Sequence, residues 1–193
     1  MSAPVNVAEL RTYLGTDNSA EDPVLQDMLS RALNALESMT DRNLYARQEV
    51  REFHPEDDVQ GPWLLLGDDL AEVVSVTNGD GTAWTQGVQY VTWPSRPPFW
   101  KLKAVGGYSW GWSTDPDLDR IQVDGYWGRT RNLEGESREA VIKLAAFLYR
   151  QRDNVSDADR PIVTPEGIVL MPARLPPEIQ SFVKRRRKRR VMA

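Results

Sequence analysis

The spacing of hydrophobic residues predicts helices toward both ends of the chain and short strands between them. In residues 22–42 the apolar side chains recur every three or four positions, which is the period of an amphipathic helix. This stripe consists of Leu25, Met28, Leu29, Ala32, Leu36 and Met39. Asp22-Pro23 supplies a cap and a first-turn proline, so we place the start of the helix there.

A shorter helix is predicted over residues 5–15. Asn6 is a suitable cap, and Glu9 stands three residues later as a capping-box partner. Gly15 fits the left-handed position at which many helices end.

The middle third of the chain has short β-rich runs separated by glycine, proline, asparagine and aspartate. Strands are predicted at residues 48–53, 63–66, 71–77, 82–86, 88–93, 99–105 and 120–127. Asn78-Gly79-Asp80-Gly81 is a strong hairpin turn because these residues tolerate positive φ. Residues 106–116, rich in glycine and serine, are expected to form an exposed loop.

Helical periodicity returns over residues 135–151, where the apolar face is Ala140, Val141, Leu144, Ala145 and Leu148. Residues 153–160 are polar and are expected to be mobile, and residues 162–171 resemble a small turn or hairpin. Pro176-Pro177 then opens a last helix. Its apolar anchors are Ile179, Phe182 and Val183.

These elements predict an α+β fold in which a small core of about four helices carries an inserted antiparallel β subdomain. We expect N-terminal core helices in residues 1–46, the β insertion in 47–130, a core helix in 131–153, and an arm with a basic helix in 154–193.

The longest apolar runs, at 63–66 and 144–148, are far too short to cross a bilayer. No signal peptide is recognisable at the start of the sequence.

Charge is distributed very unevenly. The chain has 24 basic and 28 acidic residues, yet residues 184–190 are all basic: Lys184, Arg185, Arg186, Arg187, Lys188, Arg189 and Arg190. Without these seven cations, 17 basic residues face 28 acidic ones, a net charge of −11. Like charges repel along a helix, so we expect this run to fray until an anionic partner neutralises it. Phe182 and the seven cations are therefore the candidate docking residues for a protein or for DNA.

Seven tryptophans lie between positions 63 and 127. They could form a stacking platform for sugars or single-stranded bases, but we favour core packing in a small β subdomain. Trp110 and Trp112, in the glycine-rich loop, are the exception, because an exposed pair there would make a subunit or tail contact.

Evidence for catalysis is weak, and we predict that the chain is not an enzyme. No phosphate-binding loop, GxSxG or HExxH motif occurs, and the absence of cysteine excludes thiolate chemistry. His54 is the single histidine, and the acidic residues after it indicate a solvated turn rather than a metal site. Asp68-Asp69 is interpreted as ordinary turn chemistry. We expect no metal and no cofactor.

The order of these elements resembles that of the head–tail connector, or adaptor, proteins of tailed bacteriophages. The resemblance rests on the helix at 35–44 running into the strand at 49–53, on the hairpin series around Asp80-Gly81, and on residues 121–128 (IQVDGYWG) leading to the helix at 140–150. It covers about residues 5–152 and, more loosely, the basic segment. The β insertion is large for that family.

The resemblance implies a structural role in the virion neck, reached after assembly in the host cytoplasm. Such adaptors form a dodecameric ring under the portal vertex, bind the portal through their C-terminal segment, receive the stopper or tail-completion protein below, and pass the genomic DNA through the centre. Two alternatives stay open: a nucleic-acid-binding protein anchored by residues 184–190, and a carbohydrate-binding β module.

Overall fold

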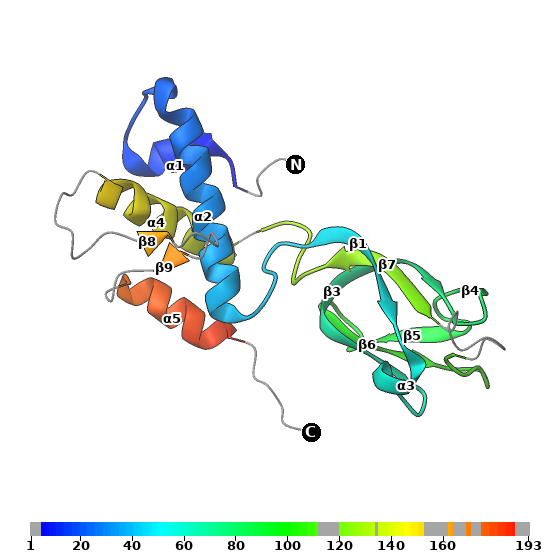
Figure 1. Ribbon diagram of the computed structural model, residues 1–193. Coiled ribbons are helices and arrows are strands. Elements are labelled where there is room, and N and C mark those ends of the chain that lie inside the picture. Colours follow the sequence, from blue (N-terminus) through cyan, green and yellow to red (C-terminus); the bar gives the residue numbers. More distant parts are fainter. Residues whose placement is uncertain are drawn as a thin grey trace. The chain divides into compact units, whose positions relative to one another are not determined.

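The computed structural model describes residues 5–111, 120–133, 135–152, 162–163, 169–170 and 175–187. The chain forms two compact units, shown in Figure 1. The helical unit comprises Met1–Leu44 and Leu133–Ala193, and the β unit comprises Tyr45–Asn132. The predicted α+β fold is confirmed, with the β-rich segment inserted between helices.

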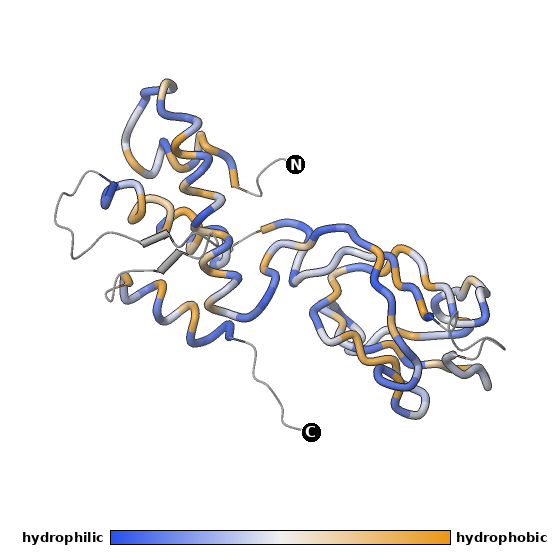
Figure 2. Tube along the Cα trace, in the orientation of Figure 1, coloured by the Kyte–Doolittle hydropathy of each residue, from blue (hydrophilic) through white to orange (hydrophobic). Residues whose placement is uncertain are grey.

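The helical unit is built on α2 (Asp22–Thr40) and α4 (Gly135–Arg152), which pack against each other. Their predicted apolar stripes form the core, since every predicted α4 face residue is buried and only Met39 of the α2 stripe is partly exposed. Figure 2 shows apolar and polar residues alternating along these helices.

Helix α1 (Val7–Leu14) packs on both long helices, and the 3-10 turn η1 (Ser19–Glu21) leads into α2. Asn6 caps α1 by accepting a hydrogen bond from the Ala8 backbone N–H at 3.0 Å, and Gly15 ends it at φ 72°. Glu9 was expected to serve the cap, and, after the larger effect of Arg138, a hydrogen bond with the Asn6 backbone does contribute to lowering the pKa of its carboxyl group, as expected for a capping box. The same carboxylate also accepts from Arg138 of α4, whose Nε lies 2.8 Å from Oε2, and so ties α1 to α4.

The remaining elements of the helical unit are α5 (Pro177–Arg186) and the antiparallel pair β8 (Ile162–Val163) and β9 (Val169–Leu170). The pair agrees with the predicted hairpin. The predicted mobile segment at 153–160 lies outside the described residues.

The β unit is an antiparallel sheet with strand order β1-β7-β3-β6-β5. These strands are β1 (Arg47–Phe53), β3 (Trp63–Thr77), β5 (Tyr90–Trp93), β6 (Phe99–Ala104) and β7 (Ile121–Trp127). Two short strands, β2 (Val59–Gln60) and β4 (Ala83–Trp84), pair with β3, and α3 (Pro55–Asp58) precedes β2.

The prediction of separate strands at 63–66 and 71–77 is wrong, because β3 is continuous. Gly67 adopts φ 71°, and the β3–β6 register shifts between Leu65 and Leu70. The bulge lets β3 pair first with β6 and then with β7, so Leu70 has partners in both strands. Asp68-Asp69 therefore lies within a strand, and Asp68 binds Arg51 at 2.9 Å.

One apolar core fills the β unit. Both halves of the sheet contribute to it, through side chains such as Leu64, Leu102, Ile121 and Trp127. The alternation of buried and exposed residues along β7 is the period-two pattern of a half-buried strand. The Asn78–Gly81 turn joins β3 to β4 as predicted, with Gly81 at φ 79°.

Candidate functional site

The C-terminal basic segment begins on a helix that is firmly attached to the helical unit. Ile179 and Phe182 of α5 are 1% and 2% exposed, and α5 packs against α4 and α2. Phe182 was predicted to be a docking residue, but its ring packs inside the chain, and the small part that stays accessible lines the groove between α4 and α5. Its position follows from its spacing of three residues from Ile179, which places both on one helix face.

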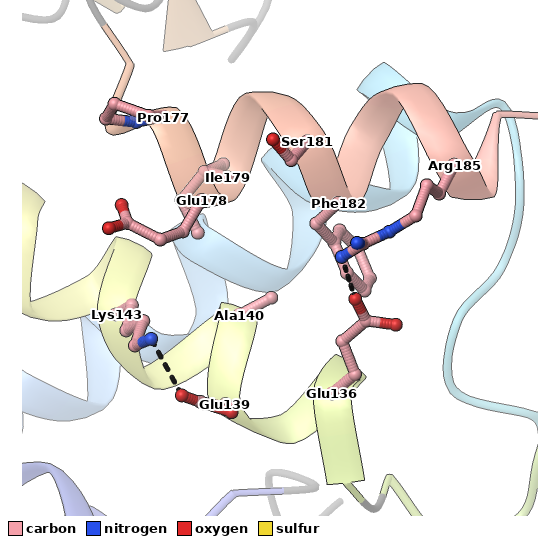
Figure 3. Close-up of a pocket in the computed structure, with 10 residues that line it drawn as sticks. All are labelled: Glu136, Glu139, Ala140, Lys143, Pro177, Glu178, Ile179, Ser181, Phe182 and Arg185. Atoms are coloured by element: carbon pink, nitrogen blue, oxygen red, sulfur yellow. Dashed lines mark hydrogen bonds and ion pairs between the residues drawn. The ribbon is translucent and has the colours of Figure 1, made fainter.

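An open groove of about 400 Å³ runs between α4 and α5 (Figure 3). Its floor includes Ala140 and Phe182, and charged side chains line its sides. The Lys143 Nζ lies 2.7 Å from Glu139 Oε1, and this hydrogen bond raises the pKa of Lys143.

Glu136, in the first turn of α4, is the counter-charge of the basic helix. Its carboxylate binds Arg185, and its Oε2 lies 3.0 Å from Arg186 Nη2. The run was expected to fray until an anionic partner neutralises it, and for these two arginines Glu136 of the same chain supplies the negative charge. Helix α5 continues through them to Arg186 instead of fraying before the cations.

Two further cations of the run are exposed. Lys184 and Arg187 have no carboxylate partner among the described residues. The remaining cations, Lys188, Arg189 and Arg190, lie outside the described residues. Among the described cations of the run, Lys184 and Arg187 are therefore available to an anionic partner.

Trp110 belongs to the core of the β unit, which differs from the exposed contact that we expected. It is 2% exposed, its indole N–H donates to the Pro62 carbonyl at 2.9 Å, and its ring centroid lies 4.4 Å from that of Trp84. Asn78 holds the adjacent backbone, accepting from the Gly111 N–H at 2.9 Å and donating to its carbonyl at 3.3 Å. Residues 106–109 are exposed as predicted, and Trp112 lies outside the described residues.

The other described tryptophans divide into two groups. Trp84 and Trp127 are buried with Trp110, which agrees with the core interpretation. Trp93 and Trp100 are 47% and 52% exposed, and Trp63 is half-buried. Sequence reasoning missed this exposed set, although the alternation of Lys101, Leu102 and Lys103 already indicates a strand with one polar face.

A second hollow, of about 470 Å³, lies beside the Asn78–Gly81 turn. Arg120 and Glu52 meet there at 2.8 Å, and the hydrogen bond from Arg120 lowers the pKa of Glu52. We interpret Arg120 and Glu52 as an ordinary ion pair on a solvated surface.

His54 precedes the acidic turn α3, where its backbone N–H donates to Asp58 at 2.9 Å. Within the described ranges, no group of three or more histidine and acidic side chains is placed to hold a metal ion. None of the helices in that part of the chain is long and apolar enough to cross a membrane.

No protein-family model and no curated protein matches the sequence. Solved structures do match. A chain in the neck of an empty gene transfer agent (GTA) particle, computed with C6 symmetry, superposes with a TM-score of 0.64 at 22% identity, over 100% of this chain and 95% of that one. A chain of the native GTA virion gives a TM-score of 0.63 at 22% identity, over 98% and 92%.

A chain from the neck of the native GTA particle, computed with C12 symmetry, gives a TM-score of 0.61 at 20% identity, over 100% of this chain and 94% of that one. The chain therefore shares its fold, along almost its whole length, with proteins from the neck of a phage-like particle. The resemblance to head–tail connector proteins is confirmed at the level of the fold.

Proposed function

We propose that this chain is a structural protein of the virion neck: a head–tail connector that forms a ring beneath the portal vertex and joins the capsid to the tail. The observation that carries the proposal is the fold match with GTA neck chains, which spans both proteins almost completely. A match of this extent includes the helical unit and the inserted β unit, so it does not rest on a common small motif. The C6 and C12 symmetries of those necks support a ring of identical subunits.

In this proposal the chain acts by binding and not by chemistry. The portal protein and a stopper or tail-completion protein are its partners, as the resemblance to phage adaptors implies, and genomic DNA passes through the ring. The net charge of −11 outside the basic run supports a channel to which DNA does not adhere, because like charges repel.

The docking element for the portal is the basic segment that Glu136 does not neutralise. Phe182 and Ile179 anchor α5 to its own subunit, so α5 serves as the base of the arm. Lys184, Arg187 and residues 188–190 then project cations toward an acidic surface. Such contacts are individually weak, and added salt screens them.

The test is capture of the full-length chain by the portal ring of the same phage at low and high salt. A variant ending at Arg187 removes three cations but keeps α5 and its buried anchors. A second variant changes Arg187, Lys188, Arg189 and Arg190 to glutamine in the full-length chain. We expect both variants to lose most portal binding at low salt.

The matched control changes Arg31 to glutamine. This residue is an exposed arginine of α2 paired with Asp27 at 2.8 Å, so the change removes a cation without touching α5. The control should bind like the parent chain. Undiminished capture of both tail variants would refute the assigned role of the basic segment, and absence of any portal binding by the parent chain would refute the connector proposal.

The basic run also motivates the second candidate function, nucleic-acid binding. If the run contacts about six phosphates of duplex DNA, log K should fall with log salt with a slope of about −5. Strong, tail-dependent DNA capture without portal binding would favour this alternative. The carbohydrate alternative has less support, because Trp84, Trp110 and Trp127 are buried and Lys101 covers one face of Trp63.

A further inference from the structure

Most charged side chains in the described part of the β unit have an ion pair or a hydrogen bond within it, and two sets of opposite sign have no partner of opposite charge there. Arg51 binds Asp68, Arg120 binds Glu52, and Arg131 binds Glu72. On the acidic side, Glu49 binds Arg51, Asp124 accepts from Gln48, and Asp58 and Asp80 accept backbone N–H groups.

The basic residues without a carboxylate partner lie on the β5–β6 hairpin. Lys101, Lys103 and the turn residue Arg96 have no carboxylate partner in the part of the β unit that the structure describes. This is unusual in a unit whose sequence, residues 45–132, contains 8 lysines and arginines against 13 acidic residues. In such an acidic unit, cations without counter-charges indicate a binding surface for an anionic group.

Two tryptophans share a sheet face with these lysines. Lys101 pairs with Trp93 across β5 and β6, and Lys103 pairs with Trp63 across β3 and β6. Directly opposite residues of antiparallel strands project from the same face, and Lys101 and Lys103 are two residues apart. We call Trp63, Trp93, Lys101 and Lys103 the lysine–tryptophan face.

This face is already organised for binding. The Lys101 Nζ lies 4.2 Å from the centroid of the Trp63 ring, and the Lys103 Nζ lies 5.4 Å from it. Trp93 meets Trp63 edge to face at 6.0 Å and remains 47% exposed. Cation–π contacts hold the lysine side chains in place, so less conformational entropy is lost when a partner binds. Tryptophan is also one of the residue types enriched at protein–protein hot spots.

The acidic residues without a cationic partner lie on α3 of the same unit. Glu56 and Asp57 are exposed, and neither has a cationic partner among the described residues. The two sets of unpaired charges do not form ion pairs with each other within one chain. The basic set on the β5–β6 hairpin and the acidic set on α3 are therefore both available to bind residues of opposite charge on another copy.

We propose that the lysine–tryptophan face of one subunit binds the α3 turn of the next copy of this chain, through contacts of Lys101 and Lys103 with Glu56 and Asp57. In this proposal each subunit offers its lysine–tryptophan face to one neighbour and its α3 turn to the other. Such a contact is head-to-tail, and its repetition generates a ring when the rotation closes. The inference rests on the proposed ring-forming function. It assigns the β insertion a role in holding neighbouring subunits together.

Zero-length carbodiimide crosslinking tests this contact directly, because it joins an amine to a carboxylate only where the two already touch. Equal amounts of ¹⁴N- and ¹⁵N-labelled full-length chains are mixed and crosslinked in two settings: in solution at high concentration without the portal, and bound to the portal ring. The products are analysed by mass spectrometry. We expect peptides that join Lys101 or Lys103 to Glu56 or Asp57 with one label of each kind. Absence of these mixed-label peptides in both settings would overturn the proposal.

Charge reversal gives an independent result. Lys101→Glu with Lys103→Glu, and Glu56→Lys with Asp57→Lys, should each weaken self-association about tenfold or more, because like charges then face each other. The chain with all four changes should associate again. Lys143→Glu in the helical unit is the control for a general charge effect and should leave self-association intact. Unchanged association of both reversed pairs, or failure of the fourfold variant to recover while it stays folded, would overturn the proposal.

Portal capture separates this inference from the proposed function. The reversed pairs keep α5 and the basic run, so individual copies should still bind the portal. If the parent chain and both reversed pairs form equal rings on the portal, the subunit contact is refuted and the connector function stands. If the parent chain does not bind the portal at all, the connector function itself fails. Loss of DNA binding in Lys101→Glu with Lys103→Glu, without loss of self-association, would assign the face to nucleic acid and refute the subunit contact.

Discussion

Arg186 and Glu136 join the C-terminal helix to the start of α4, with Arg186 Nη2 3.0 Å from Glu136 Oε2. Arg185 binds the same carboxylate, so one acidic residue neutralises part of a run of seven cations. The basic segment is thereby divided into a part that stabilises its own subunit and a part that remains available to a partner.

We expect Glu136→Gln to release both arginines while α5 remains packed through its apolar residues. The pairs are largely solvent-exposed, so the loss of unfolding free energy should be small, about 0.5 kcal/mol. Amide hydrogen exchange should accelerate over residues 183–187, where the Arg187 N–H donates to the Val183 carbonyl at 2.9 Å. Glu139→Gln is the control, since it breaks the pair with Lys143 on the same helix and should leave α5 exchange unchanged.

Phe182→Ala should destabilise the helical unit far more than loss of the ion pairs. The ring is 2% exposed, and removing a buried phenylalanine ring costs about 3–5 kcal/mol because a cavity remains. Denaturant unfolding followed by circular dichroism measures this change. Val183→Ala, on the half-buried neighbour, should cost clearly less. Equal stability of the two variants would contradict the assignment of Phe182 to the core.

The ion pair between Glu9 and Arg138 predicts a pH-dependent contribution to stability. The hydrogen bond from Arg138 lowers the pKa of Glu9, with smaller help from the charge of Arg138 and the backbone of Asn6. A carboxylate whose pKa is lowered on folding stabilises the protein above its unfolded pKa, and this stabilisation is lost as the pH falls through the folded value.

Glu9→Gln should therefore reduce the unfolding free energy at neutral pH by about 0.5 kcal/mol. The effect is small because the side chains of Arg138 and Glu9 are 40% and 35% exposed, so solvent screens the ion pair. The difference from the parent chain should disappear in acid, once Glu9 is protonated in both states. Unfolding curves recorded between neutral pH and strong acid measure it. A difference that persists in acid would show that the ion pair is not its source.

Asn78→Ala should loosen the loop that carries Trp110. Asn78 is 3% exposed, and its amide makes two hydrogen bonds to the Gly111 backbone. Leaving buried backbone groups without partners costs about 1–3 kcal/mol. The measurable results are a lower unfolding midpoint of the β unit and greater quenching of tryptophan fluorescence by iodide. Gln86→Ala, at an exposed position, is the control and should change neither.

Periodicity and capping were sufficient to predict the helices, because those signals are local. The apolar stripe from Leu25 to Leu36 and the cap at Asn6 lie where the sequence indicates. The resemblance to connector proteins rested on the order of such elements, and the fold agrees with it.

Features that depend on distant partners could not be predicted in this way. Glu136 is about fifty residues from the arginines that it binds, and no local pattern links them. The continuity of β3 depends on a bulge at Gly67 and on the change of partner from β6 to β7. The burial of Trp110 depends on Pro62 and Asn78, both far from it in the sequence.

The central claim is that copies of this chain form a ring on the portal. Electron microscopy of the full-length chain mixed with the portal ring of the same phage tests it most directly. The account predicts a closed, symmetric layer of this protein on one end of the portal, with an open channel at its centre. A portal that remains bare at saturating protein concentration, or that carries only scattered single copies, would contradict the account.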